Sequence, residues 1–153
     1  MQKIKKLLQE INQLLKKSDY LTNTTYPVIK EPKLLCSITE CLQKTTEKII
    51  ELVIYRERLY KRINVIKRPY IQEFETFKKI AKKYDISEEE IEFIKELKRI
   101  VAAKKESPME FKRRNKYVIC SNNYNMNVLD FKKVKNYVQK TKKIVQNLNK
   151  KLI

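Results

Sequence analysis

The sequence predicts a mainly α-helical protein, a single-domain bundle of about five helices over residues 1–153 with a small β-hairpin near residues 116–129. Apolar residues make up 42% of the chain and recur at the three- and four-residue spacing of amphipathic helices. A length of 153 residues suits one domain that buries its own core. One stretch near the C-terminal third instead combines β-forming residues with a turn signal.

The longest helical pattern covers residues 32–66 and predicts a central core helix. Its apolar positions form a heptad seam, which flanking residues widen into a broad face. The seam and its flanks comprise Leu35, Ile38, Leu42, Thr45, Ile49, Leu52, Val53, Arg56, Leu59, Tyr60 and Ile63. Because a guanidinium at a core position needs a partner, we expect Arg56 to pair with a distant acid such as Glu40 or Glu92, with ligand binding as the alternative.

Before the central helix, an amphipathic pattern over residues 3–17 predicts the first helix. Residues 18–31 collect Asp, Asn, Thr and Pro and are expected to form a connection. Tyr26, Val28 and Ile29 are too apolar for a free linker, so the connection should pack against the bundle.

After the central helix, Phe74, Phe77 and Tyr84 belong to a third, shorter helix. Their helical spacing favours core packing over base stacking. Ser87 and Glu90 form a capping box that opens a fourth helix, whose acidic first turn suits the helix dipole better than a metal cluster.

The C-terminal third begins with a helix-start signal at residues 107–110, Ser-Pro-Met-Glu, which predicts a short turn of helix. Residues 116–120 and 126–129 are expected to pair as the hairpin, with a turn at residues 121–123. A last helix starts at about Asp130, its expected cap, and continues the heptad spacing.

The composition excludes several functional classes. The chain contains no Gly, so it cannot form the usual glycine-rich phosphate or dinucleotide loops. It contains no His, which excludes His-based catalysis and imidazole zinc sites. Cys36, Cys41 and Cys120 match no zinc or redox spacing and are expected to be free thiols. We therefore expect no catalytic residue, no metal, no cofactor and no enzymatic activity.

The charge balance points to a polyanionic partner. The chain has 36 Lys and Arg against 18 Asp and Glu, a formal net charge of +18. No stretch has the length of a membrane span and the N-terminus lacks a signal-peptide pattern, so a cytoplasmic protein without a membrane partner is expected.

Three basic clusters are the candidate nucleic-acid-binding residues. The first lies on the last helix, where eight Lys and no acid occur, although a lysine-rich composition would produce a similar solvated face. The second surrounds the start of the hairpin, where Arg suits phosphate and Tyr suits stacking. The third follows the central helix. The candidates are Lys132, Lys133, Lys140, Lys142, Lys143; Lys112, Arg113, Arg114, Lys116, Tyr117; and Arg62, Lys67, Arg68.

Residues 55–63, Tyr-Arg-Glu-Arg-Leu-Tyr-Lys-Arg-Ile, lie on the long central helix and resemble the helical bundle of the HEPN superfamily, many members of which bind or cleave RNA. Catalytic members carry Arg followed after four to six residues by His. Arg56, Arg58 and Arg62 could each open that motif, but the chain has no His to close it. Residues 25–27, 59–63 and 105–111 are also similar to small archaeal proteins of unassigned activity, a resemblance that implies no particular reaction.

The sequence therefore predicts a non-enzymatic RNA-associating protein, with RNA or a ribonucleoprotein such as the ribosome as partner. Two alternatives stay open at this point. One is a protein-interaction module or homo-oligomer that uses a helical seam. The other is a degenerate HEPN-type RNA-cleaving protein.

Overall fold

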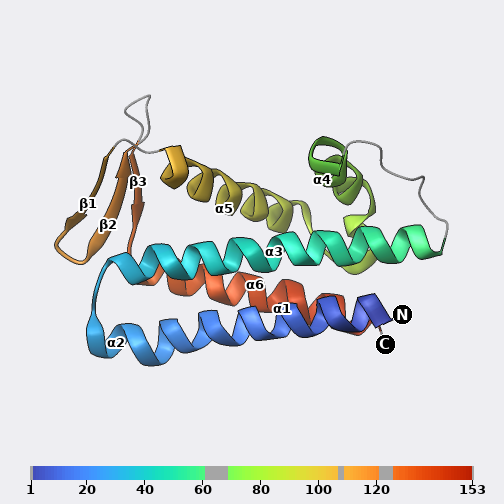
Figure 1. The fold of residues 1–153 in the computed structure, drawn as a ribbon, viewed down its shortest axis with the longest axis horizontal. Helices are drawn as coiled ribbons and strands as arrows, with labels where there is room; N and C mark the ends of the chain where they lie inside the picture. Colours follow the sequence, from blue (N-terminus) through green and yellow to red (C-terminus); the bar gives the residue numbers. More distant parts are fainter. Residues whose placement is uncertain (1, 61–68, 107–108, 121–125, 153) are drawn as a thin grey trace.

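The computed structural model describes residues 2–60, 69–106, 109–120 and 126–152, and these residues are mostly helical. Five long helices share one core, and a three-stranded antiparallel sheet lies at one end of the molecule (Figure 1). The two chain termini lie together at the opposite end. The predicted class, a helical bundle with a small β element, is confirmed.

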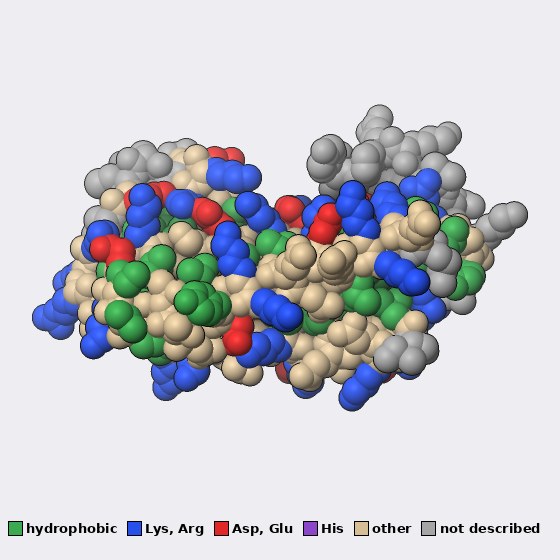
Figure 2. Space-filling model, turned by 60° about the horizontal axis from the view of Figure 1, so that its bottom comes forward, with side chains coloured by type: hydrophobic (Ala, Val, Ile, Leu, Met, Phe, Trp, Pro, Cys, Tyr) green, Lys and Arg blue, Asp and Glu red, His purple; other side chains and the backbone are tan. Residues whose placement is uncertain are grey.

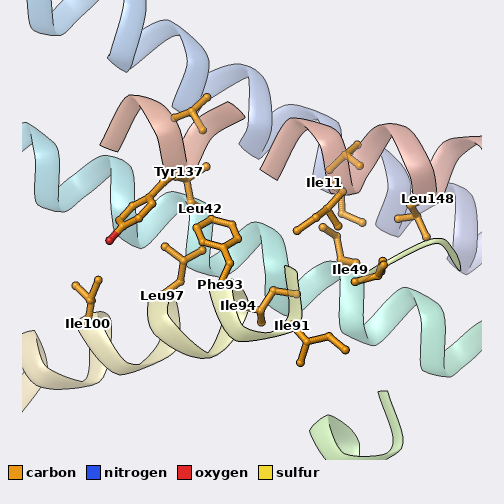
Figure 3. Close-up of a cluster of buried hydrophobic side chains, with 14 of the residues drawn as sticks. Ile11, Leu42, Ile49, Ile91, Phe93, Ile94, Leu97, Ile100, Tyr137 and Leu148 are labelled. Atoms are coloured by element: carbon orange, nitrogen blue, oxygen red, sulfur yellow. The ribbon is translucent and has the colours of Figure 1, made fainter. Parts of the chain in front are cut away.

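The central element is α3 (Lys33–Leu59), as the heptad seam predicted. It contacts α1 (Gln2–Tyr20), α4 (Pro69–Ile80), α5 (Glu88–Glu106), α6 (Phe131–Leu152) and the sheet. Its seam is buried from Ile38 to Leu52, whereas Leu59 and Tyr60 are exposed and Ile63 lies outside the described residues. Figure 3 shows the result, with Ile11 of α1, Leu42 and Ile49 of α3, and side chains of α5 and α6 meeting in one apolar cluster.

The expected connection at residues 18–31 is instead helical, and this correction has a local cause. The helix continues from α1 through one π-helical turn (Leu21–Thr25) into α2 (Tyr26–Ile29). Ser18 and Thr22 donate their hydroxyls to the carbonyls of Leu14 (3.0 Å) and Ser18 (2.7 Å). Such bonding to the preceding turn satisfies the side chains without ending the helix.

The apolar residues of α2 divide between core and surface. Tyr26 is buried, as expected, but Val28 and Ile29 are 82% and 61% exposed. The helix ends at Lys30, whose backbone is left-handed (φ 54°) and whose N–H donates to the Tyr26 carbonyl (2.7 Å).

The third and fourth helices follow the predicted pattern. In α4 and the 3₁₀ turn after it (Ala81–Tyr84), Phe77 and Tyr84 are buried in the core, as their spacing indicated. The capping box before α5 is formed: Ser87 N–H donates to Glu90 Oε1 (3.0 Å) and Glu90 N–H donates to Ser87 Oγ (3.2 Å).

The β element has one strand more than the predicted hairpin. Strands β2 (Lys116–Cys120) and β3 (Met126–Leu129) pair antiparallel as expected. The predicted short helix at residues 107–110 is wrong, because β1 (Met109–Arg113) pairs with β2 along its whole length, from Met109 opposite Cys120 to Arg113 opposite Lys116. This pairing overrides a helix signal whose Ser and Pro lie outside the described residues.

Arg56 does not pair with either expected acid. Glu40 forms an ion pair with Lys104, and Glu92 forms one with Lys95. Arg56 instead donates from Nη1 to the Tyr84 hydroxyl (3.1 Å), and that hydroxyl donates to Oε1 of the fully buried Glu57 (2.8 Å). The fully buried charged side chain of α3 is therefore Glu57, whereas Arg56, the residue that the seam predicted at a core position, is half-buried.

Candidate nucleic-acid interface

The N-terminal end of α6 is fixed by its predicted cap. Lys133 N–H donates to Asp130 Oδ1 (2.7 Å). One face of α6 enters the core through residues at heptad spacing, from Val134 to Leu148. The opposite face is exposed to solvent, and most of the α6 lysines belong to one of two groups.

The first group of α6 lysines makes intramolecular contacts. Lys142 pairs with Asp19 of α1 (2.6 Å). Lys133 donates to the Val128 carbonyl (3.4 Å), and Lys140 Nζ lies 5.4 Å from the ring centroid of Phe93. These three predicted contact residues therefore also hold α6 to α1, β3 and α5.

The second group forms a continuous exposed line, which we call the α6 stripe. Its members follow one another at steps of four and three residues, so they share one face of the helix. Lysines and side-chain amides mix along it, and no residue of α6 is acidic. The α6 stripe consists of Lys132, Asn136, Gln139, Lys143, Gln146 and Lys150, all of them exposed. Over its eighteen-residue separation it spans about 27 Å, at about 1.5 Å per residue.

The hairpin cluster is only partly exposed. Arg113, Arg114 and Lys116 are exposed around the two-residue turn that joins β1 to β2. Lys112 pairs with Glu31, which fixes β1 to the segment after α2. Arg114 has a positive φ of 57°, a conformation that glycine normally takes.

Tyr117 is buried and is therefore not available for base stacking as predicted. Its hydroxyl donates to Glu110 Oε2. Burial and this hydrogen bond raise the pKa of Tyr117 to about 12. The residue holds β2 against the core, and a stacking surface must come from other aromatic rings.

Such rings lie where α2, the hairpin turn and the start of α6 meet. An open groove of about 680 Å³ lies there, and we call it the aromatic groove. Tyr26 and Phe131 stack along its wall, with ring centroids 4.8 Å apart and planes within 8°. The lining residues are Tyr26, Pro27, Lys30, Asn115, Lys116, Asp130, Phe131 and Lys132.

The groove joins two of the three predicted basic clusters. Lys116 comes from the hairpin cluster and Lys132 from α6, where it also begins the α6 stripe. Lys30 adds a third cation that the sequence did not single out. The remaining predicted residues, Arg62, Lys67 and Arg68, lie outside the described residues.

Tyr26 lines the groove and carries a hydroxyl group. The residue is 6% exposed, and within the described part of the chain no hydrogen-bond partner accompanies its hydroxyl. Burial, with the neighbouring charges of Asp130 and Glu31, raises the pKa of Tyr26. The hydroxyl therefore keeps its proton at neutral pH and can donate it to a ligand oxygen.

The surroundings of the groove are basic and apolar. Figure 2 shows Lys and Arg side chains spread over the face that carries α1, and apolar side chains grouped at the end that holds α2 and the sheet. The exposed Val28 and Ile29 belong to that end. Within the described ranges, no helix is both long and apolar enough to cross a membrane, and no three acid or thiol side chains converge to hold a metal ion.

Comparisons with known proteins add no assignment. The chain matches no protein-family model, and neither a curated protein nor a solved structure matches it significantly. The functional argument therefore depends on the geometry of this surface.

Proposed function

We propose that this chain is a non-enzymatic RNA-associating protein, with a ribonucleoprotein such as the ribosome as its candidate partner. The observation that carries the proposal is the α6 stripe, an exposed line of Lys, Asn and Gln on a helix without acids. Lysines neutralise phosphates, and side-chain amides between them donate hydrogen bonds to phosphate and sugar oxygens.

Two acids that form ion pairs with α6 support this interpretation by their position. Asp19 pairs with Lys142 and Asp85 pairs with Lys151 (3.6 Å), both away from the stripe positions. Each of these two acids is thus paired with a lysine of α6 that does not belong to the stripe. A phosphate backbone along the stripe would meet cations and amides rather than carboxylates.

The test is RNA binding across a salt series. Changing Lys132, Lys143 and Lys150 together to Gln should reduce the salt slope, because about three counterion-releasing contacts are lost, roughly two units of log K per log salt for a single strand. The matched control changes Lys79, Lys82 and Lys105 to Gln, which removes the same charge from exposed positions on other elements. Equal slopes in the two triple variants would mean that binding follows net charge, and the stripe would not be the site.

A protein-interaction role is the second candidate, and one observation favours it. The heptad seams of α3 and α6 are buried inside the chain, so they are not the surface it would use. The exposed Val28 and Ile29 offer another apolar surface. A concentration-dependent molecular mass that Val28→Ser abolishes would support this candidate.

A degenerate HEPN-type ribonuclease receives less support from the geometry. The chain has no His, and Arg56 is engaged with the buried Tyr84 hydroxyl. Metal-independent cleavage of RNA by the purified protein, lost in Arg56→Lys, would restore this alternative.

A further inference from the structure

We propose that the aromatic groove binds one unpaired nucleotide of the RNA, so that the protein selects RNA with an extrahelical or single-stranded base over a continuous duplex. This inference rests on the proposed function and specifies its substrate. It assigns a role to the surface between α2, the hairpin turn and α6, where residues from three distant parts of the sequence meet.

The groove offers the two chemistries that a nucleotide needs. Phe131 is half-buried, stacks one face of its ring on Tyr26 and has Lys135 Nζ 5.9 Å from its ring centroid. Pro27 is exposed and lines the groove with Phe131, so the two residues supply its apolar surface for a base. Lys30, Lys116 and Lys132 line the same space and supply charge for a phosphate. A volume of about 680 Å³ lies within the range of small-ligand sites.

The Tyr26 hydroxyl adds a directional contact. It lines the groove on a residue that is almost fully buried, and within the described residues it has no hydrogen-bond partner. Its ring is held flat against Phe131, which fixes the direction of the hydroxyl. A hydroxyl without a partner among the described residues can donate to an oxygen of the ligand.

Charge distribution explains why the ligand is an RNA segment and not a free neutral aromatic compound. Lys132 belongs to both the groove and the α6 stripe, so a strand that follows the stripe reaches the groove without a break. Asp130 also lines the groove, but its carboxylate accepts the Lys133 N–H and is occupied as a helix cap.

An unpaired base fits this surface better than a paired one. Bases of an A-form duplex are stacked and their faces are covered, so they cannot reach a half-buried ring such as Phe131. A base outside the stack can contact a protein aromatic ring without preference for sequence. The groove thus recognises an RNA feature, whereas the α6 stripe recognises phosphate in general.

Lys30 allows binding to be separated from folding. Its left-handed backbone is unfavourable for a residue with a Cβ atom, so Lys30→Gly relieves strain while it removes a groove cation. Asp85→Gly is the control for strain relief alone, because Asp85 has nearly the same φ (57° against 54°) and does not line the groove. It removes an acid that pairs with Lys151, so its melting temperature and not its RNA affinity is compared with that of Lys30→Gly. A Lys30→Gly protein that melts no lower than wild type and binds less well cannot owe its defect to unfolding.

The experiment compares two RNA hairpins of equal length, one fully paired and one with a single bulged 2-aminopurine nucleotide, at fixed salt. Wild type should prefer the bulged hairpin by about fivefold or more, and the fluorescence of the bulged base should change on binding as it stacks. Tyr26→Phe keeps the stacked ring and loses the hydroxyl, and should reduce the preference by roughly two- to tenfold. Phe131→Leu should abolish the fluorescence change.

The outcomes separate the inference from the proposed function. If wild type binds both hairpins equally with a normal salt slope, the groove inference is overturned and RNA association stands. If wild type binds neither hairpin, both fail. A preference that survives in Tyr26→Phe, Phe131→Leu and Lys30→Gly would place the selective site elsewhere. Binding to anionic phospholipid vesicles that these variants weaken more than RNA binding would assign the groove to lipid and overturn the inference.

Discussion

The substitution Tyr84→Phe tests the buried polar cluster that joins α3 to the turn after α4. Tyr84 is 1% exposed, and its hydroxyl donates to Glu57 (2.8 Å) and accepts from Arg56 (3.1 Å). Both partners are charged, and a hydrogen bond to a charged group contributes about 1.5–3 kcal/mol. Phe keeps the ring and its packing, so the expected loss of unfolding free energy is that of the hydroxyl, about 1.5–3 kcal/mol.

The chain provides a matched control in Tyr137→Phe. The Tyr137 hydroxyl donates to Glu96 Oε1 (3.0 Å), and Tyr137 is also buried. Glu96, however, is only half-buried, so water can replace the lost hydroxyl. The expected loss is about 0.5–1.5 kcal/mol, smaller than for Tyr84→Phe.

Urea melts of the two variants and wild type measure this difference, with equal m-values as the check that the unfolded states are comparable. Thermal melts should show a decrease on the order of 3–12 °C for Tyr84→Phe in a chain of this size. If Tyr84→Phe costs no more than Tyr137→Phe, the Glu57 carboxylate does not depend on the hydroxyl, and the description of this cluster as a buried charge network is incorrect.

Three further predictions concern the core, a helix cap and alkaline pH. Leu52→Ala on α3 should destabilise the fold by roughly 2–5 kcal/mol, because Leu52 is fully buried, and a loss below about 0.5 kcal/mol in urea melts would contradict the packing. Asp130→Ala removes the cap of α6 and should cost about 1 kcal/mol, whereas Asp130→Asn should recover most of it in the same melts. Tyr117 has a pKa raised from 10.0 to about 12, so the unfolded chain ionises first and stability falls as the pH rises from 10 to 12. Thermal melts of Tyr117→Phe should show a flatter decline over that interval, and an unchanged decline would mean that Tyr117 ionises normally in the fold.

Helix periodicity predicted most of this fold because each helix buries one face in a common core. The central seam, the capping box and the Asp130 cap all depend on short-range spacing, and the structure contains them. The two errors have a shared cause. At residues 18–31 and 107–110, the residue types favoured one conformation, and hydrogen bonds that the residue types do not reveal favoured another. Back-bonding hydroxyls maintained the helix in the first segment, and pairing with β2 formed a strand in the second.

The candidate site could be predicted only in part. The sequence shows which residues of α6 are basic, but exposure depends on neighbours that come from other elements. Lys142 and Lys143 are adjacent in sequence, yet Asp19 of α1 pairs with the first, while the second lies on the exposed stripe. The stacking of Tyr26 on Phe131 joins residues that are far apart in the sequence, and no local pattern indicates it.

The absence of glycine connects the fold to the proposed site. Among the described residues, Lys30, Asp85 and Arg114 have a positive φ, a conformation that glycine adopts at a lower free-energy cost. Each such residue disfavours the fold by roughly 1–2 kcal/mol, so stability alone does not explain the choice of side chain. Lys30 lines the aromatic groove, and Arg114 precedes Asn115, which lines it as well. Lys30 thus lies at the groove and Arg114 is next in sequence to a lining residue, whereas Asp85 accepts the strain elsewhere and pairs with Lys151 of α6. Strained positions are often retained where their side chains act, and the proposed nucleotide site would account for the charge of Lys30.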